Sequence, residues 1–308
     1  MKLGRTEVEV NSLGVGAWAW GDRMTWGYGR DYGKSEVRAA YDASRESGLD
    51  FFDTAEIYGM GRSERLLGEF VRSSDGSVVA TKFFPYPWRF GPGSILGALR
   101  GSLHRLGLPR VGLYQIHWPS PAFPAQTLAQ GLARIIEVGL AQAVGVSNFS
   151  PRQTREVHRA LEDRGIPLAS NQIEYSLLER RVETSGVLSA CRELGVTVIA
   201  YSPLAMGLLS GKYTPTHPMP LARRRAFPRM DLRRLQKLIG ALREVGQAHA
   251  GKTASQVALN WVMAKGALPI PGAKNAAQAR ENAGASGWTI TPDEACYLER
   301  AADEAVRR

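Results

Sequence analysis

The sequence predicts an α/β fold, a (β/α)8 TIM barrel, from the order and spacing of its apolar segments. Eight short runs rich in Val, Ile and Ala recur along the 308 residues, and amphipathic stretches separate them. Most runs begin about 25–35 residues apart, the spacing that strand–helix–strand units require. The runs are continuously apolar rather than alternating, which is typical of parallel strands buried on both faces.

The predicted strands cover residues 13–18, 51–55, 78–82, 111–117, 143–148, 168–175, 196–202 and 268–272. Helical stripes lie between them, such as Leu96, Leu99, Leu103 and Leu106 at three- and four-residue spacing. Start signals stand at Ser150-Pro151 and at Thr291-Pro292, which is followed by a capping-box Glu294. Helix stops are indicated by the glycines at 48, 107, 139, 165 and 195.

Three segments fall outside the repeat. Residues 6–10 are expected to form an N-terminal hairpin that closes the bottom of the barrel. Extra helices are expected around residues 231–249, in the long connection after the seventh strand, and over residues 291–306. Because no linker interrupts the pattern, we expect residues 1–308 to form a single domain.

Composition narrows the class of protein. Lysine and arginine exceed aspartate and glutamate by ten, which favours an anionic ligand or partner. Two cysteines are too few for a disulfide framework or a four-cysteine zinc site and suit a reducing compartment. The N-terminus lacks a signal-peptide core, and no stretch is long and apolar enough to span a membrane. We therefore expect a cytoplasmic protein that binds no membrane.

Polar side chains at the predicted strand ends indicate an active site, because a barrel brings these ends together at one mouth. Asp53 ends the second strand, with Tyr58 five residues later, while Lys82 and His117 end the third and fourth. A buried Asp–Lys pair satisfies its own charges, and its ammonium can lower the pKa of a nearby tyrosine. Tyr58 would then act as a general acid, with His117 orienting a carbonyl. This set favours carbonyl reduction over acyl transfer.

The chain resembles the aldo-keto reductases over nearly its full length. The matching segments are LDFFDTAEIYGMGRSERLLG, VVATK, VGLYQIHWP, AVGVSNFS, NQIEYS, IAYSPLAMGLLSGKY and PIPGAKNAAQARENA. Its GAK-type segment and long loop after the seventh strand are similar to those of bacterial, plant and potassium-channel-β members. The resemblance implies an NADPH/NADP+-dependent reductase of small carbonyl substrates, with Asp53, Tyr58, Lys82 and His117 as the catalytic tetrad.

The resemblance also implies where NADPH binds. The nicotinamide would contact Ser147, Asn148 and Gln172 and stack on Tyr201. The pyrophosphate and adenosine phosphate would be held by two loops, comprising Ser202, Leu204, Gly207, Leu209 and Lys212, and then Gly272, Lys274, Gln278, Glu281 and Asn282. Trp20, Trp26, Trp88 and Trp118 are expected either to supply apolar walls for the substrate or to pack in the core.

The same residues allow other interpretations. A channel-β-type protein that senses NADPH with little turnover would keep the same tetrad. Gly14–Ala19 matches a loose dinucleotide fingerprint but is not followed by a helix, so it is expected to begin a pocket loop. Arg223, Arg224 and Arg225, with Arg229, Arg233 and Arg234 beyond, lack a nucleic-acid motif and favour a solvated loop that adds positive potential near the cofactor phosphates. The histidine spacing predicts no metal site, and the sequence indicates no oligomeric state.

Overall fold

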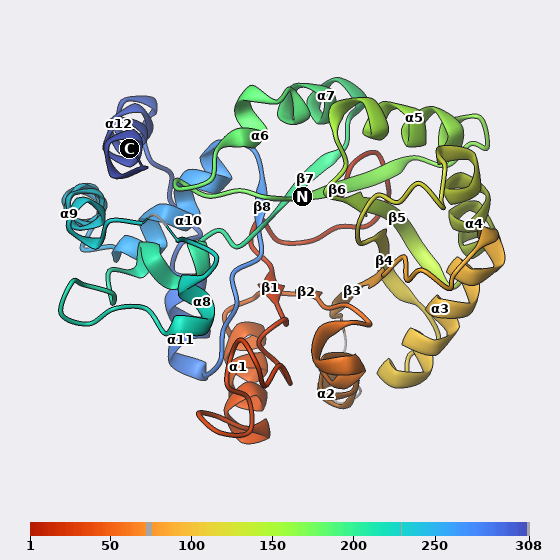
Figure 1. Cartoon of the computed structure of the whole chain (residues 1–308), viewed down its shortest axis with the longest axis horizontal. Helices are drawn as coiled ribbons and strands as arrows, with labels where there is room; N and C mark the ends of the chain where they lie inside the picture. Colours follow the sequence, from red (N-terminus) through yellow and green to blue (C-terminus); the bar gives the residue numbers. More distant parts are fainter. Residues whose placement is uncertain (72–75, 229, 307–308) are drawn as a thin grey trace.

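The computed structural model, which describes residues 1–71, 76–228 and 230–306, contains eight parallel strands paired in chain order. Figure 1 shows these strands at the centre, with helices arranged around them. The strands are β1 (Val15–Gly16), β2 (Phe51–Asp53), β3 (Val78–Phe83), β4 (Val111–Ile116), β5 (Ala141–Ser147), β6 (Leu168–Glu174), β7 (Thr197–Tyr201) and β8 (Leu268–Pro269). A parallel bridge from Gly16 to Gly272 joins the first strand to the segment after the last. The predicted barrel is confirmed.

The strand-connecting helices are α1 (Lys34–Glu46), α2 (Arg62–Val71), α3 (Gly91–Leu106), α4 (Ala125–Glu137), α5 (Pro151–Glu162), α6 (Arg181–Thr184), α7 (Val187–Leu194), α10 (Ala254–Ala264) and α11 (Ala276–Ala283). Two short 3-10 helices, η1 (Tyr58–Gly61) and η2 (Ala205–Ser210), follow β2 and β7 directly. Ser150 caps α5 by accepting a hydrogen bond from the Gln153 amide, as predicted. In the described part of the chain, no helix is long and apolar enough to cross a membrane.

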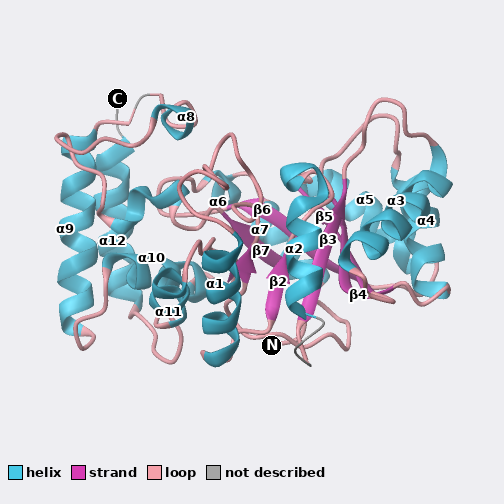
Figure 2. Cartoon of the chain, turned by 90° about the horizontal axis from the view of Figure 1, so that it is seen from below, coloured by secondary structure: helices cyan, strands magenta, loops and turns pink. Residues whose placement is uncertain are grey.

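Additional helices stand outside the repeat. They are α8 (Leu221–Arg224), α9 (Leu232–Ala248) and the C-terminal α12 (Pro292–Val306), so both predicted extra helices are confirmed. Figure 2 shows α9 and α12 packed side by side at one edge of the barrel. The short α8 belongs to the long connection between β7 and α10, where it borders the cavity described below.

The interior of the barrel is closed at its base by the N-terminal segment. Leu3, Val8 and Val10 are buried against the inward-facing side chains of the strands. The segment pairs over a wider range than residues 6–10, since an antiparallel bridge joins Lys2 to Glu9 and the Val10 amide donates to the Met1 carbonyl. The predicted hairpin therefore occupies the expected place with different limits.

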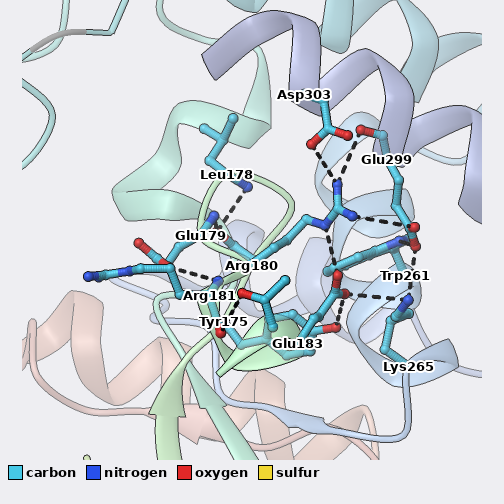
Figure 3. Close-up of polar contacts among 12 residues, drawn as sticks. Tyr175, Leu178, Glu179, Arg180, Arg181, Glu183, Trp261, Lys265, Glu299 and Asp303 are labelled. Carbon is cyan, nitrogen blue, oxygen red and sulfur yellow. Dashed lines mark hydrogen bonds and ion pairs between the residues drawn. The ribbon is translucent and has the colours of Figure 1, made fainter. Parts of the chain in front are cut away.

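A cluster of charged side chains fastens α12 to the barrel wall (Figure 3). Arg180, just before α6, donates to Glu183 at 3.1 Å and to Asp303 of α12 at 3.0 Å. Lys265, at the end of α10, lies 3.1 Å from Glu299 of α12 and 3.4 Å from Glu183. Because each cation bridges two elements, the cluster joins the connection after β6 to both α10 and α12.

Candidate active site

Four predicted catalytic side chains meet at the ends of neighbouring strands. Lys82, the fifth residue of β3, forms a buried ion pair with Asp53 at the end of β2. Nζ of Lys82 also lies 3.4 Å from the hydroxyl oxygen of Tyr58 in η1. The ring of His117, which follows β4, stands edge-on to the Tyr58 ring with centroids 5.7 Å apart. The barrel therefore brings together the residues that the sequence separates by 64 positions, from Asp53 to His117 (117 − 53 = 64).

Hydrogen bonds satisfy the buried charges of the Asp53–Lys82 pair. Oδ2 of Asp53 accepts hydrogen bonds from Gln115 at 3.2 Å and from Gln172 at 2.9 Å. Nζ of Lys82 donates to the Thr54 carbonyl oxygen at 2.9 Å. A buried ion pair is tolerated when its remaining polar atoms find such partners, as those of Asp53 and Lys82 do here.

Gln115 is a member of the site that the sequence analysis missed. It is fully buried near the end of the apolar strand β4, and its own amide oxygen accepts a hydrogen bond from Ser170 at 3.3 Å. A lone glutamine in an apolar strand, two residues before His117, was the available signal. Buried amides are nearly always hydrogen-bonded, which would have predicted a polar partner inside the barrel.

The electrostatics of Tyr58 differ from the sequence-based expectation. Burial raises the pKa of the Tyr58 hydroxyl well above its usual value, and the nearby Asp53 carboxylate raises it further. The expected lowering by Lys82 was wrong for this state, because Asp53 offsets the ammonium and the surroundings disfavour a phenolate. Tyr58 therefore holds its proton at neutral pH, as a proton donor must.

His117 is neutral at physiological pH. Burial lowers the pKa of its imidazole to about 3, and the neighbouring Lys82 ammonium contributes in the same direction. Its Nδ1 is buried and has no hydrogen-bond partner within residues 1–71, 76–228 and 230–306. A neutral imidazole can present one N–H to a carbonyl oxygen beside Tyr58.

A cavity of about 370 Å³ opens above the Asp53 and Tyr58 side chains. Eleven of the predicted cofactor residues line it: Gln172, Tyr201, Ser202, Leu204, Gly207, Lys212, Gly272, Lys274, Gln278, Glu281 and Asn282. They come from β6, β7, η2 and the turn from β8 into α11, so loops distant in sequence form one wall. Ser255, at the start of α10, also lines the cavity and was not predicted.

Three predicted cofactor residues lie outside the cavity wall. Asn148 donates to Ser147 Oγ at 3.0 Å and accepts a hydrogen bond from the Tyr201 hydroxyl at 3.0 Å, so Asn148 links Ser147 to Tyr201. Leu209 is fully buried in the hydrophobic core. The Leu209 side chain therefore does not line the cavity.

One end of the cavity is positively charged. Lys212, Lys274 and Arg223 line it together, the last from α8. Burial lowers the pKa of Lys274 to about 8, and the Arg223 and Lys212 charges add to this effect. Burial and Arg223 likewise lower the pKa of Lys212. Nε of Arg223 is buried without a hydrogen-bond partner in the described part of the chain, so this end is suited to an anion.

The arginine run of the sequence divides in the structure. Arg223 lies over the rings of Trp26 and Tyr213, with its guanidinium 5.1 Å and 5.7 Å from their centroids. Arg224 and Arg225 are exposed, and Arg229 lies outside the described residues. The expected positive potential near the cavity is thus carried by one member of the run.

Lys274 connects the far end of the cavity to the loop after β1. Its Nζ donates to the Trp26 carbonyl oxygen at 2.8 Å and lies 4.5 Å from the centroid of the Tyr32 ring. The Tyr32 hydroxyl donates to the Ala19 carbonyl oxygen at 2.5 Å. These contacts hold residues 19–33 along the cavity, which agrees with the expected pocket loop.

The predicted tryptophan wall requires a correction. Trp20 is fully buried, donates from Nε1 to the Ala273 carbonyl at 2.8 Å and packs against core rings, so it is a core residue. Trp26 lines the cavity, as does Trp18, which was not predicted. Trp88 and Trp118 lie on the loops after β3 and β4 and are 70% and 46% exposed.

Comparison with known proteins places the chain in a family. Residues 12–303 match the model of the aldo/keto reductase family. The chain is 42% identical to the chloroplastic pyridoxal reductase of Arabidopsis thaliana, over 97% of this chain and 85% of that protein. It is 29% identical to the aldo-keto reductase YhdN of Bacillus subtilis, over 94% and 89% of the two chains.

Solved structures agree with this placement. A thermostable aldo-keto reductase, Tm1743, crystallised with the inhibitor epalrestat, superposes with a TM-score of 0.80 at 30% identity, covering 98% of each chain. A glycerol dehydrogenase from Gluconobacter oxydans gives a TM-score of 0.84 at 26% identity, covering 98% of this chain and 95% of that one. The fold and the site define a barrel oxidoreductase that acts on carbonyl compounds. The chain belongs to the aldo/keto reductase family.

Proposed function

We propose that this protein is an NADPH-dependent reductase that converts aldehyde or ketone carbonyls to alcohols, with Tyr58 as the proton donor. The observation that carries the proposal is the position of the Tyr58 hydroxyl. It lies 3.4 Å from Nζ of Lys82, in a cavity that three cationic side chains also line. One cavity therefore offers a proton donor and, at a distance from it, a site for a phosphorylated cofactor.

The side chains present fit NADPH. Lys212, Lys274 and Arg223 surround the cationic end, and charge-assisted hydrogen bonds to phosphate oxygens would relieve their mutual repulsion. Asn275 begins α11 at the same place by accepting a hydrogen bond from the Gln278 amide. A helix start adds a positive dipole end that favours phosphate. The planar Tyr201 ring, held by Asn148, supplies a surface on which a nicotinamide would stack.

The chain's own residues would handle the proton while the bound cofactor supplies the hydride. Tyr58 enters the reaction protonated, since burial raises the pKa of its hydroxyl. Neutral His117 can donate a hydrogen bond to the carbonyl oxygen and fix its orientation. When Tyr58 gives up its proton, the Lys82 ammonium at 3.4 Å stabilises the phenolate, and Asp53 holds Lys82 in place.

The substrate we propose is an aromatic aldehyde, with pyridoxal as the first compound to test. The similarity to a pyridoxal reductase supports this choice. Aromatic side chains surround the reactive groups, since the Trp18 ring lies 6.2 Å and the Phe84 ring 5.8 Å from the rings of Tyr58 and His117. Trp26, Trp88 and Trp118 would extend this aromatic lining toward the mouth of the cavity.

Multiple-turnover oxidation of NADPH tests the proposal. Purified protein is mixed with a large molar excess of NADPH and pyridoxal, and cofactor oxidation is compared with a reaction lacking aldehyde. Many turnovers per protein molecule are expected. A single turnover with tight NADPH binding would instead support the NADPH-sensing alternative, and the absence of both binding and turnover would contradict the proposal.

A further inference from the structure

An ion pair outside the tetrad connects the catalytic turn to the loop after β3. Glu56 stands two residues before Tyr58, and its side chain is only 7% exposed. Both of its carboxylate oxygens contact the guanidinium of Arg89, the second contact measuring 2.9 Å. A two-point contact between planar groups fixes orientation as well as distance.

The same pair holds both ends of the segment from Phe84 to Arg89. The Phe84 amide donates to Glu56 Oε1 at 2.7 Å, and Nη1 of Arg89 donates to the Phe84 carbonyl at 2.9 Å. The segment has no helix or strand of its own between Phe83 and Gly91. Two backbone hydrogen bonds shape it, from the Tyr86 amide to the Phe84 carbonyl and from the Arg89 amide to the Tyr86 carbonyl, both at 2.9 Å. The buried Glu56–Arg89 pair attaches this turn to the chain before Tyr58.

This segment carries a row of rings that begins at the active site. We call Phe84, Tyr86 and Trp88 the aromatic strap. The Phe84 ring stands edge-on to His117 with centroids 5.8 Å apart, and Tyr86 lies 4.8 Å from Phe84. Trp88 stacks on Tyr86 at 4.6 Å with an interplanar angle of 10°. The strap runs from a catalytic residue to an indole that is 70% exposed.

Arg89 also braces the strap directly. Its guanidinium lies 5.0 Å from the centroid of the Phe83 ring and 5.1 Å from that of Tyr86. Loss of the Glu56 carboxylate would leave this cation without its buried partner and free the loop to move. The rings would then no longer keep a fixed position beside His117.

We propose that Glu56 and Arg89 are positioning residues for substrate selection. They hold the aromatic strap as a side wall against which the ring of an aromatic aldehyde packs, while the carbonyl reaches Tyr58 and His117. This inference rests on the proposed function. A short aliphatic aldehyde reaches the same reactive groups without extending to Tyr86 and Trp88, so the pair affects the two substrates unequally.

Two variants test this role. Glu56→Gln keeps the shape of the side chain and removes its charge, whereas Arg89→Lys keeps the charge and loses the planar fork. For Glu56→Gln we expect KM for pyridoxal to rise about threefold to tenfold, the equivalent of one lost aromatic contact. The ratio of kcat/KM for pyridoxal to that for propanal should fall by a similar factor. For Arg89→Lys, this ratio should lie between that of Glu56→Gln and that of the wild type.

The matched control is Glu137→Gln, which breaks the exposed Arg134–Glu137 pair of α4, an ion pair that makes no contact with Glu56 or Arg89. It should leave the substrate ratio unchanged. An equal loss for both aldehydes in Glu56→Gln, or no loss for either, would overturn the positioning role. If the wild type reduces neither aldehyde, the proposed function is wrong, whatever the variants do.

The positioning role has a readout that needs no turnover. Chymotrypsin cleavage after Trp88, mapped by mass spectrometry, reports how tightly the strap is held, because prolines after Phe84 and Tyr86 block cleavage at those residues. Cleavage there should be several times faster in Glu56→Gln than in the wild type or Glu137→Gln. Identical cleavage rates would show that the ion pair does not fix the strap.

Discussion

Nζ of Lys82 lies 3.4 Å from the hydroxyl oxygen of Tyr58, while its opposite side is paired with Asp53. The ammonium therefore lies between the Asp53 carboxylate and a phenol that is neutral at rest. In the resting site Asp53 offsets the effect of Lys82, and the pKa of Tyr58 stays high. Lys82 matters most when charge develops on the Tyr58 oxygen, because a buried cation stabilises an anion strongly.

Lys82→Met should lower both turnover and stability. Removal of one partner from a buried ion pair leaves Asp53 uncompensated, which costs about 3–5 kcal/mol of unfolding free energy. Turnover should fall because no cation remains beside the Tyr58 oxygen. Urea denaturation and steady-state kinetics measure the two effects. The control is Lys34→Met, which removes an exposed partner of Glu69 and should change the unfolding free energy by under about 1 kcal/mol.

His117 should make the fold sensitive to mild acid. Its imidazole has a pKa of about 3 in the folded protein, against about 6.5 when unfolded. Below the unfolded value the unfolded chain binds a proton that the folded chain does not, so stability is present above pH 6.5 and is lost as the pH falls toward 3. When the pH is lowered from 7 to 5, His117 should lower the free energy of unfolding by about 2 kcal/mol.

Urea denaturation of the wild type and of His117→Gln at pH 7 and pH 5 isolates that contribution. Other groups titrate alike in both proteins, so the difference between their pH dependences belongs to His117. The variant should lose about 2 kcal/mol less than the wild type on acidification. The same loss in both proteins would mean that His117 is already protonated or solvated in the fold.

Lys274 should select NADPH over NADH. A charge-assisted contact to the 2′-phosphate is worth about 1.5–3 kcal/mol, which corresponds to roughly 10–150-fold in affinity. Lys274→Ala should raise the dissociation constant for NADPH by about that factor and change NADH binding little. Fluorescence quenching titrations measure both constants. Equal losses of affinity for the two cofactors would mean that Lys274 supports the loop around Trp26 instead. The control is Arg224→Ala, which changes an exposed arginine of α8.

The same lysine should make NADPH binding depend on pH. Without a bound anion the pKa of Lys274 is about 8, and a phosphate would raise it. NADPH affinity should therefore decrease as the pH rises through 8, because binding then requires uptake of a proton. This decrease should be absent in Lys274→Ala. An NADPH affinity that is flat between pH 7 and 9 in the wild type would contradict a contact between Lys274 and the phosphate.

The sequence predicted the barrel and the tetrad because both depend on position along strands. Parallel strands bring their carboxyl ends to one mouth, so Asp53 and Lys82 could be placed together before any contact was known. Strand lengths were overestimated at β1 and β8. At β8 the reason is local, since Pro269 and Pro271 have no amide hydrogen to donate to a neighbouring strand.

Features that depend on side-chain direction could not be predicted. Trp20 and Trp18 are two residues apart in one loop, yet one packs in the core and the other lines the cavity. The pKa of Tyr58 depends on the balance between burial, Asp53 and Lys82, which only distances decide. Arg223 could be recognised as cationic from the sequence, whereas its place among Lys212 and Lys274 required the path of the loop after β7.

The most direct test of the account compares the wild type with Tyr58→Phe in steady-state reduction of pyridoxal by NADPH, with Tyr297→Phe as a surface control. The account predicts that Tyr58→Phe lowers kcat by about 10²–10⁴-fold, the contribution of a positioned general acid. NADPH binding should stay nearly unchanged, because Tyr58 is not among the side chains proposed to hold the cofactor phosphates. A Tyr58→Phe variant with the kcat of the wild type would contradict the central claim that Tyr58 donates the proton.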